Sequence, residues 1–203
     1  MKKTKTAITT MATCAIFTSS ALAQNLLLDG SFESPVIPAN TYQYNLTPDF
    51  WTITDITYMF NGSVYNGSYW PLAQDGQQYF NLGNGSISQN FAVSTPGQFN
   101  LSFYDNALGV PGLNVTLENS SFQTVASSTL TLTAGDWQEV TIPLDLTADT
   151  YTLTFSAQNI AGSWDPLIDN VSITTVPEPS SALLGAVGFA VIMYRRFVTR
   201  KSA

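Results

Sequence analysis

Apolar and polar residues alternate with a period of two along most of the chain between residues 24 and 175, a segment called the body below. Residues 98–104 place Phe99, Leu101 and Phe103 on one face of an extended segment and polar side chains on the other. The same alternation recurs at 113–117, 140–144, 151–155 and 167–173. Because a strand with one apolar face is half buried in a sheet, the pattern predicts a series of short β-strands.

Turn-forming residues separate these predicted strands. Examples are Asn-Gly-Ser at 61–63, Gln-Asp-Gly at 74–76 and Thr-Pro-Gly at 95–97. Short strands with one buried face and frequent turns are typical of a sandwich, so we predict an all-β fold with a single jelly-roll-type β-sandwich. Residues 38–70 alternate less clearly, and we expect long loops there.

The N-terminal segment has the organisation of an export signal. Lys2, Lys3 and Lys5 precede an apolar stretch, and Ala-Leu-Ala at 21–23 supplies a small-residue cleavage site. We therefore predict a signal peptide over residues 1–23, removed before Gln24. The single cysteine of the chain lies inside this segment, so the body is expected to fold without disulfides.

The last 28 residues combine three features in order. A Val-Pro-Glu-Pro turn contains Pro177, Glu178 and Pro179, an apolar run follows at 180–194, and a basic end occupies 195–203. We predict that the apolar run forms a short transmembrane helix. Because basic flanks stay in the cytoplasm, the body is expected on the outer side of that membrane.

This tripartite tail resembles the PEP-CTERM sorting signal of Gram-negative bacteria. The matching residues are Pro177, Glu178 and Pro179, the apolar run, and the pair Arg195 and Arg196. The resemblance implies an exosortase-type sorting protease as a partner, anchorage in the inner membrane before sorting, and then a place at the cell surface or in the extracellular matrix. It also implies an organism that makes exopolysaccharide. An ordinary tail anchor is the alternative, and whether the tail is cleaved or retained stays open.

Charge separates the body from the two ends. All 7 Lys and Arg residues lie in the ends, the chain has no histidine, and the body carries Asp and Glu without a single base. Such a body has no positive surface for phosphates, which excludes nucleic acid as a partner. The acidity favours neutral partners or divalent cations. A hydrophobic content of 44% and an aromatic content of 12% favour one packed domain over a disordered chain.

Two segments near the ends of the body resemble galactose-binding-like jelly rolls and related carbohydrate-binding modules. They are Asn-Leu-Leu-Leu-Asp-Gly-Ser-Phe-Glu at 25–33 and Pro-Leu-Ile-Asp-Asn-Val-Ser-Ile at 166–173. The resemblance implies that these two segments form neighbouring first and last strands and share a structural Ca²⁺, with Glu33 and Asp169 among its ligands. Such a cation takes six to eight oxygen ligands. The alternative is that Asp169 accepts hydrogen bonds from a turn and that Glu33 is solvated.

Few kinds of catalysis fit the body. Without His, Cys, Lys or Arg it has no Ser–His pair, thiolate, Schiff base or zinc site of the usual kinds. A carboxylate pair for glycoside hydrolysis is the remaining option. The candidates are Asp105, Asp136, Glu139, Asp145, Asp149 and Asp165, most of which occur at turns. We expect no enzymatic activity, with glycoside hydrolysis as a remote alternative.

Aromatic side chains in polar loops suggest carbohydrate binding, because their apolar faces stack on sugar rings. The candidates are Tyr65, Tyr69 and Trp70, with Trp164 in another turn. For Trp70, simple packing under the edge of the sandwich is the alternative. Trp51 and Trp137 are predicted to lie in the core.

These features together predict an exported, surface-sorted, non-enzymatic protein of the exopolysaccharide or biofilm matrix that binds carbohydrate. A protein of a different class fits as well. It would be a structural or adhesion protein that associates with itself and has no defined sugar ligand.

Overall fold

The computed structural model describes residues 24–177, apart from residues 63, 66–67, 108–111, 133 and 159–165. All regular elements of this part are strands. They are β1 (Thr41–Tyr44), β2 (Thr52–Thr54), β3 (Tyr58–Asn61), β4 (Val64–Tyr65), β5 (Ser68–Tyr69), β6 (Gln78–Asn81), β7 (Ser86–Val93), β8 (Gly97–Ala107), β9 (Gly112–Asn119), β10 (Thr124–Thr131), β11 (Gln138–Leu146), β12 (Asp149–Gln158) and β13 (Pro166–Thr175).

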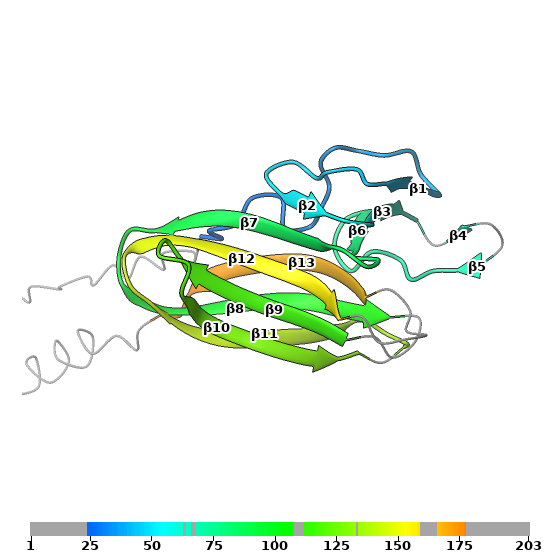
Figure 1. Ribbon diagram of the computed structural model, residues 1–203. Coiled ribbons are helices and arrows are strands. Elements are labelled where there is room, and N and C mark those ends of the chain that lie inside the picture. Colours follow the sequence, from blue (N-terminus) through cyan, green and yellow to red (C-terminus); the bar gives the residue numbers. More distant parts are fainter. Residues whose placement is uncertain are drawn as a thin grey trace, which may run out of the picture.

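Two antiparallel sheets form the layers of the fold (Figure 1). One has six strands in the order β1-β3-β6-β13-β8-β11, and the other has five in the order β10-β9-β12-β7-β2. Strands β4 and β5 pair as a separate small hairpin. The predicted all-β sandwich is therefore confirmed.

The core lies between the two sheets. Strand β8 contributes Phe99 and Phe103 from the face that alternation predicted. Phe155 of β12 packs edge-on against Phe103 across the sandwich, with ring centroids 5.0 Å apart. Trp51 is also buried in this core, as predicted. Since both sheets and this core lie within 24–177, that segment is expected to fold on its own.

Strand β13 departs from the simple alternation expected at 167–173. Its register against β8 shifts between Asp169 and Ser172, and Asn170 has a positive φ of 50°. This bulge reverses which face alternate residues occupy. Leu167 consequently packs on the outer face of the six-stranded sheet, whereas Val171 faces the core. The prediction of one common apolar face was therefore wrong for this strand.

The opening segment 25–33 lies along β13 but does not form a regular strand. The Leu26 N–H donates to the Ile173 carbonyl at 2.9 Å, and the Val171 N–H donates to the Gly30 carbonyl at 2.8 Å. A Cβ at Gly30 would lie 1.9 Å from the Val171 oxygen, so only glycine permits this approach. The predicted neighbourhood of the two segments is confirmed, and the predicted opening strand is wrong.

Residues 38–70 contain loops, as expected, together with short strands that weak alternation did not reveal. The predicted signal peptide at 1–23 and the predicted transmembrane helix at 180–194 lie outside the described residues, as do Glu178, Pro179, Arg195 and Arg196. No helix within the described part of the chain is long and apolar enough to cross a membrane.

Candidate functional site: an aromatic face on the six-stranded sheet

Two rows of side chains cross the outer face of the six-stranded sheet. Strand register pairs Tyr42 with Phe60 and Phe60 with Tyr79, and it pairs Tyr44 with Tyr58. Residues directly opposite one another in neighbouring strands point to the same face. Because β3 and β6 direct their alternate residues into the core, these aromatic side chains must face outward.

The rings of these rows contact one another. Phe60 stacks on Tyr79 with centroids 5.4 Å apart and planes 6° apart, and Trp70 stacks on Phe60 at 4.5 Å. Tyr42 stacks on Phe60 at 5.6 Å, and Tyr44 meets Tyr58 at 5.4 Å. We call this cluster the aromatic face. Its members are Tyr42, Tyr44, Tyr58, Phe60, Trp70, Tyr79 and Trp137.

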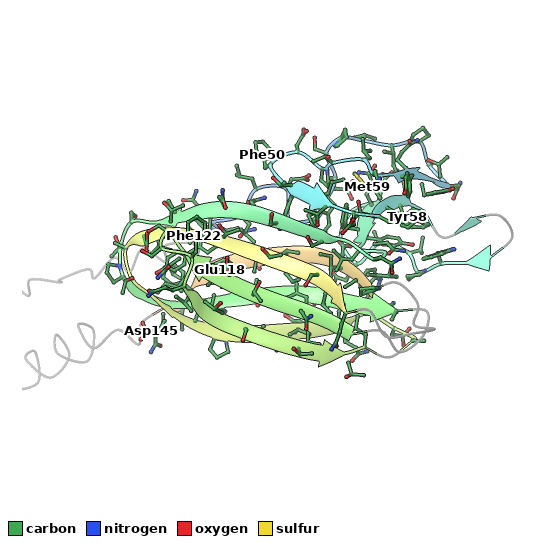
Figure 2. The ribbon with its side chains drawn as sticks, in the orientation of Figure 1. Phe50, Tyr58, Met59, Glu118, Phe122 and Asp145 are labelled. Atoms are coloured by element: carbon green, nitrogen blue, oxygen red, sulfur yellow. The ribbon has the colours of Figure 1, made fainter. Side chains whose placement is uncertain are left out.

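The aromatic face combines a buried base with an accessible surface. Phe60 and Tyr79 are buried beneath the other rings. Tyr44 is 53% exposed, and Tyr58 and Trp70 are half-buried. Figure 2 shows Tyr58 on β3, at the end of the sandwich that carries β1. The accessible rings are therefore fixed from below by the buried ones, which leaves little rotamer freedom to lose on binding.

Residues 70–78 cross the same face as an irregular segment with bends at 74–77, called the strap below. The indole N–H of Trp137 donates to the Leu72 carbonyl at 2.7 Å and its ring meets Tyr79 edge-on at 5.7 Å. The prediction that Trp137 lies in the core was wrong. It stands an odd number of positions before the inward-facing Val140 of β11, so it points outward and is half-buried.

Asp169 fixes the middle of the strap. One carboxylate oxygen, Oδ2, accepts the N–H groups of Gln74 and Asp75 at 2.7 and 3.0 Å, and Oδ1 accepts the N–H of Asn170 at 2.7 Å. The side chain is fully buried. Burial raises the pKa of Asp169 to about 7, although the three N–H donors act in the opposite direction.

Glu33 fixes the end of the strap. Its Oε1 accepts the N–H groups of Gln77 and Gln78 at 2.6 and 2.7 Å. Between these contacts Gly76 has a φ of 70°, and a Cβ there would lie 2.3 Å from Glu33 Oε1. The structure therefore brings the two predicted metal ligands to one segment. The alternative of a hydrogen-bonded Asp169 is correct, whereas Glu33 is half-buried rather than solvated.

The arrangement of Glu33 and Asp169 fits a hydrogen-bonded clasp better than a calcium site. Three of their carboxylate oxygens accept backbone N–H groups, which point toward where a cation would sit. Within the described part of the chain no group of three or more acidic, His or Cys side chains could hold a metal ion. Since Ca²⁺ takes six to eight oxygens, calcium binding by this pair stays a prediction.

Asp29 supports the base of the strap from the opening segment. Its Oδ1 accepts the N–H groups of Glu33 and Ser34 at 2.9 and 3.2 Å, and its carbonyl accepts the indole N–H of Trp51 at 3.0 Å. Burial raises the pKa of Asp29 to about 6. Asp29 thus holds Glu33 in place for its contacts with the strap.

Of the four predicted sugar-binding side chains, the described part of the structure includes that of Trp70. Trp70 belongs to the aromatic face, where it packs on Phe60 and keeps partial exposure, so the packing interpretation holds and contact with sugar stays a prediction. Tyr65 and Tyr69 lie in the β4–β5 hairpin, whose strand β4 contacts β1, and their side chains lie outside the described part. Trp164 also lies outside the described residues.

Sequence reasoning missed Tyr42 and Tyr44. The signal was the short run Thr-Tyr-Gln-Tyr at 41–44, in which two tyrosines share one face of an extended segment. Its four residues were too short to stand out within the loops of 38–70.

The carboxylates considered for glycoside hydrolysis lie on several elements. Asp136 and Glu139 are exposed near the end of the β8–β11 ladder that carries Asp105, where Glu139 pairs with Tyr104, and Asp149 begins β12. Asp105 is buried at one end of the β8–β11 ladder, where it faces Gln138, and burial raises its pKa to about 6. Asp145 is exposed at the other end of the same ladder, opposite Gln98. Asp165 lies outside the described residues. A hydrolase needs its two carboxylates on either side of one bond, which Asp105 and Asp145 do not provide.

Comparison with known proteins places the body in a family. Residues 25–174 match the family described as "Protein of unknown function (DUF642)". The chain belongs to the DUF642 family. No curated protein matches this DUF642 chain at a significant level.

Solved structures resemble the DUF642 body in fold. A family 61 carbohydrate-binding module, determined with β-1,4-galactotriose, has a TM-score of 0.50 and 15% identity, over 75% of this chain and 99% of the module. Tailspike protein 4 of bacteriophage CBA120, in its enzymatically active domain, has a TM-score of 0.52 and 17% identity, over 75% of this chain and 21% of the tailspike. A CBM4 structure has a TM-score of 0.48 and 15% identity, over 73% of this chain and 99% of that one. At these identities the likeness concerns the fold alone.

Proposed function

We propose that this DUF642 chain is a non-enzymatic carbohydrate-binding protein whose aromatic face binds an uncharged polysaccharide. The observation that carries the proposal is the set of partly exposed rings of Tyr42, Tyr44, Tyr58 and Trp70, packed on the buried rings of Phe60 and Tyr79. Apolar faces of sugar rings stack on such side chains, and a row of them matches the repeating shape of a polysaccharide.

The charge of the body selects among polysaccharides. Body residues 24–175 include Asp and Glu but no Lys, Arg or His, so an acidic polysaccharide would be repelled. A neutral chain would meet no such barrier. The family 61 module of similar fold, seen with β-1,4-galactotriose, supports a neutral glycan as the class of ligand.

The tail extends the proposal to where the protein acts. Pro177, Glu178 and Pro179 with the basic pair Arg195 and Arg196 support sorting by an exosortase-type protease, after anchorage by the apolar run 180–194. The polysaccharide would then be the exopolysaccharide of the cell surface or biofilm matrix. Structural calcium at Glu33 and Asp169 is not part of this proposal and stays a prediction of the sequence resemblance, because three of their carboxylate oxygens already accept backbone N–H groups.

Affinity electrophoresis of the 24–177 segment tests the proposal. The gels would contain neutral galactan, glucan or xylan, or an acidic polymer such as alginate. We expect retardation by at least one neutral polymer and none by alginate. Tyr44→Ala should weaken the binding about tenfold, since a ring contact contributes about 1.5 kcal/mol.

Phe122→Ala is the matched control. Phe122 is 86% exposed in the β9–β10 turn of the five-stranded sheet, whereas the aromatic face lies on the six-stranded sheet. Its removal should leave retardation unchanged. Equal losses from Tyr44→Ala and Phe122→Ala, or no retardation by any neutral polymer, would contradict the proposal.

A further inference from the structure

The two sheets have four edge strands, and they differ in how well they are protected from pairing with another chain. Edge strands β1 and β2 have only 4 and 3 residues. Edge strand β11 is longer, but Pro143 interrupts its donors and Glu139 and Asp145 add charge. Short length, proline and charge are the usual means by which natural edges avoid pairing.

Edge strand β10 is not short and has no proline or charge, and its one irregularity is a shift of register against β9 between Thr124 and Ala126. It runs for 8 residues, Thr-Val-Ala-Ser-Ser-Thr-Leu-Thr, without a charge or a proline. Within the described part of the chain only β9 pairs with it, so its other side presents backbone N–H and C=O groups in a row. Such a row is a template for strand addition.

A small gap in the packing lies beside β10. A small apolar cavity of about 10 Å³ opens between the sheets there, lined in part by Ala126 and Ser128 of β10 and by Ile142 and Leu144 of β11. Exposed apolar groups occur on the same hairpin. Val125 is 45% exposed and Phe122 is 86% exposed. Phe122 is labelled in Figure 2.

We propose that β10 is a self-association edge, at which two copies of this chain join their five-stranded sheets through antiparallel β10–β10 pairing. A two-fold axis through Ser128 places Ala126 of one copy opposite Leu130 of the other. Both residues are inward-facing and half-buried in the single chain, so the inner face continues across the junction. On the outer face Ser127 meets Thr129, which gives polar groups on both sides.

Charge favours a second copy at this edge over other surfaces of the molecule. Two acidic bodies without bases repel one another at most approaches, whereas β10 is neutral along its whole length. The nearest carboxylate on β9 is Glu118, opposite Thr124. In the two-fold arrangement the two Glu118 side chains lie roughly 25 Å apart along the strands, beyond the screening length of about 8 Å in physiological salt.

Sedimentation velocity of the 24–177 segment, from about 5 μM to 1 mM in polysaccharide-free buffer, tests the proposal. We expect a concentration-dependent dimer. Ser127→Glu should weaken it at least tenfold, because the S127E side chains of two copies would stand about 7 Å apart. Thr141→Glu is the matched control, since it adds the same charge to an exposed position of the protected edge β11 and should leave the dimer unchanged.

A mixing experiment separates the role of position 127 from a folding defect. Ser127→Lys should also be a monomer, and an equimolar mixture of S127E and S127K should recover the dimer to within about threefold of the original affinity. A monomer at every concentration would overturn the proposal. So would an S127E dimer of unchanged strength, an equal loss in T141E, or a mixture that stays monomeric.

Discussion

The carboxylates that position the strap are held by backbone amides rather than by cationic side chains. Asp169 accepts three N–H groups, Asp29 and Glu33 accept two each, and the body offers no Lys, Arg or His to pair with them. Amide donors stabilise the charge only in part, so burial still raises the pKa of Asp29 and Asp169. The strap is therefore positioned at the cost of buried negative charge.

That cost predicts an unusual dependence of stability on pH. The pKa values of Asp29 and Asp105 rise to about 6 and that of Asp169 to about 7 in the folded state, above the ordinary value of 3.8. The folded state then binds more protons than the unfolded state between about pH 4 and 7. The free energy of unfolding should therefore be highest near pH 4 and fall as the pH rises. The fall is up to about 1.4 kcal/mol per pH unit for each of the buried Asp105 and Asp169, and less for the half-buried Asp29, whose charge is screened by solvent.

Urea denaturation in chelator at pH 5 and pH 8 measures this dependence. Asp105→Asn removes one of the three groups, and its pKa shift is caused by burial alone. We expect this variant to be more stable than the original chain at pH 8 and to differ little at pH 5. Greater stability of the original chain at pH 8 than at pH 5 would contradict the interpretation.

The close approach at Gly30 predicts a large effect from a single methyl group. A Cβ there would lie 1.9 Å from the Val171 oxygen, so Gly30→Ala must push the opening segment away from β13. We expect a loss of roughly 3 kcal/mol in the free energy of unfolding. Gly97→Ala is the control, because a Cβ at Gly97 would lie 3.9 Å from its nearest neighbour, a ring carbon of Phe99. Its free energy of unfolding should change by no more than about 0.5 kcal/mol. Equal effects would contradict the geometry.

At the scale of elements, the bulge in β13 determines which of its side chains face the core and which face outward on the six-stranded sheet. It allows Leu167 and Asp169 to face outward toward the strap while Val171 and Ile173 face the core. Asn170 carries the positive φ, and its Nδ2 donates to Gln74 Oε1 at 3.0 Å. Strand β13 therefore contributes side chains to the core on one side of the bulge and hydrogen bonds to the strap at the bulge itself.

Asn170→Ala and Asn170→Gly separate the two roles of this residue. Alanine is strained at positive φ and loses the side-chain bond, so we expect a loss of about 2 kcal/mol in the free energy of unfolding. Glycine loses the bond but accepts the backbone conformation, so its loss should be smaller, about 1 kcal/mol. Thermal denaturation of both variants provides the comparison, and a glycine variant less stable than the alanine variant would contradict the assignment of the bulge.

The long strands could be predicted from sequence because their apolar alternation is regular, as at Phe99 and Phe103. Three features could not. Strand β10 has too few apolar residues to show alternation. The bulge at Asn170 changes which face the following side chains occupy, although the apolar residues still alternate in the sequence. The aromatic face joins Tyr42, Phe60 and Tyr79 from three strands, and only strand register brings them together.

At the scale of the whole molecule, the proposed glycan surface and the proposed self-association edge belong to different sheets. The aromatic face lies on the six-stranded sheet and β10 borders the five-stranded one. A dimer joined at β10 would leave both aromatic faces accessible. Such a pair would bridge two polysaccharide chains, which is a role suited to a matrix.

The melting temperature of the 24–177 segment tests whether calcium binds to the folded protein. If Glu33 and Asp169 bind Ca²⁺, millimolar calcium should raise the melting temperature of the 24–177 segment by several degrees, because ligand binding to the native state adds to its free energy of unfolding. Magnesium at the same concentration is the control. Equal melting temperatures in calcium and in chelator would show that the hydrogen-bonded clasp acts without a metal.

The measurement that tests the central claim most directly is hydrogen–deuterium exchange of the 24–177 segment with and without the neutral polysaccharide that retards it most. The account predicts slower exchange in β1, β3 and the strap, which carry Tyr42, Tyr44, Tyr58 and Trp70. Exchange in β9 and β10 of the five-stranded sheet should be unchanged. Protection confined to the five-stranded sheet, with none at the aromatic face, would contradict the account.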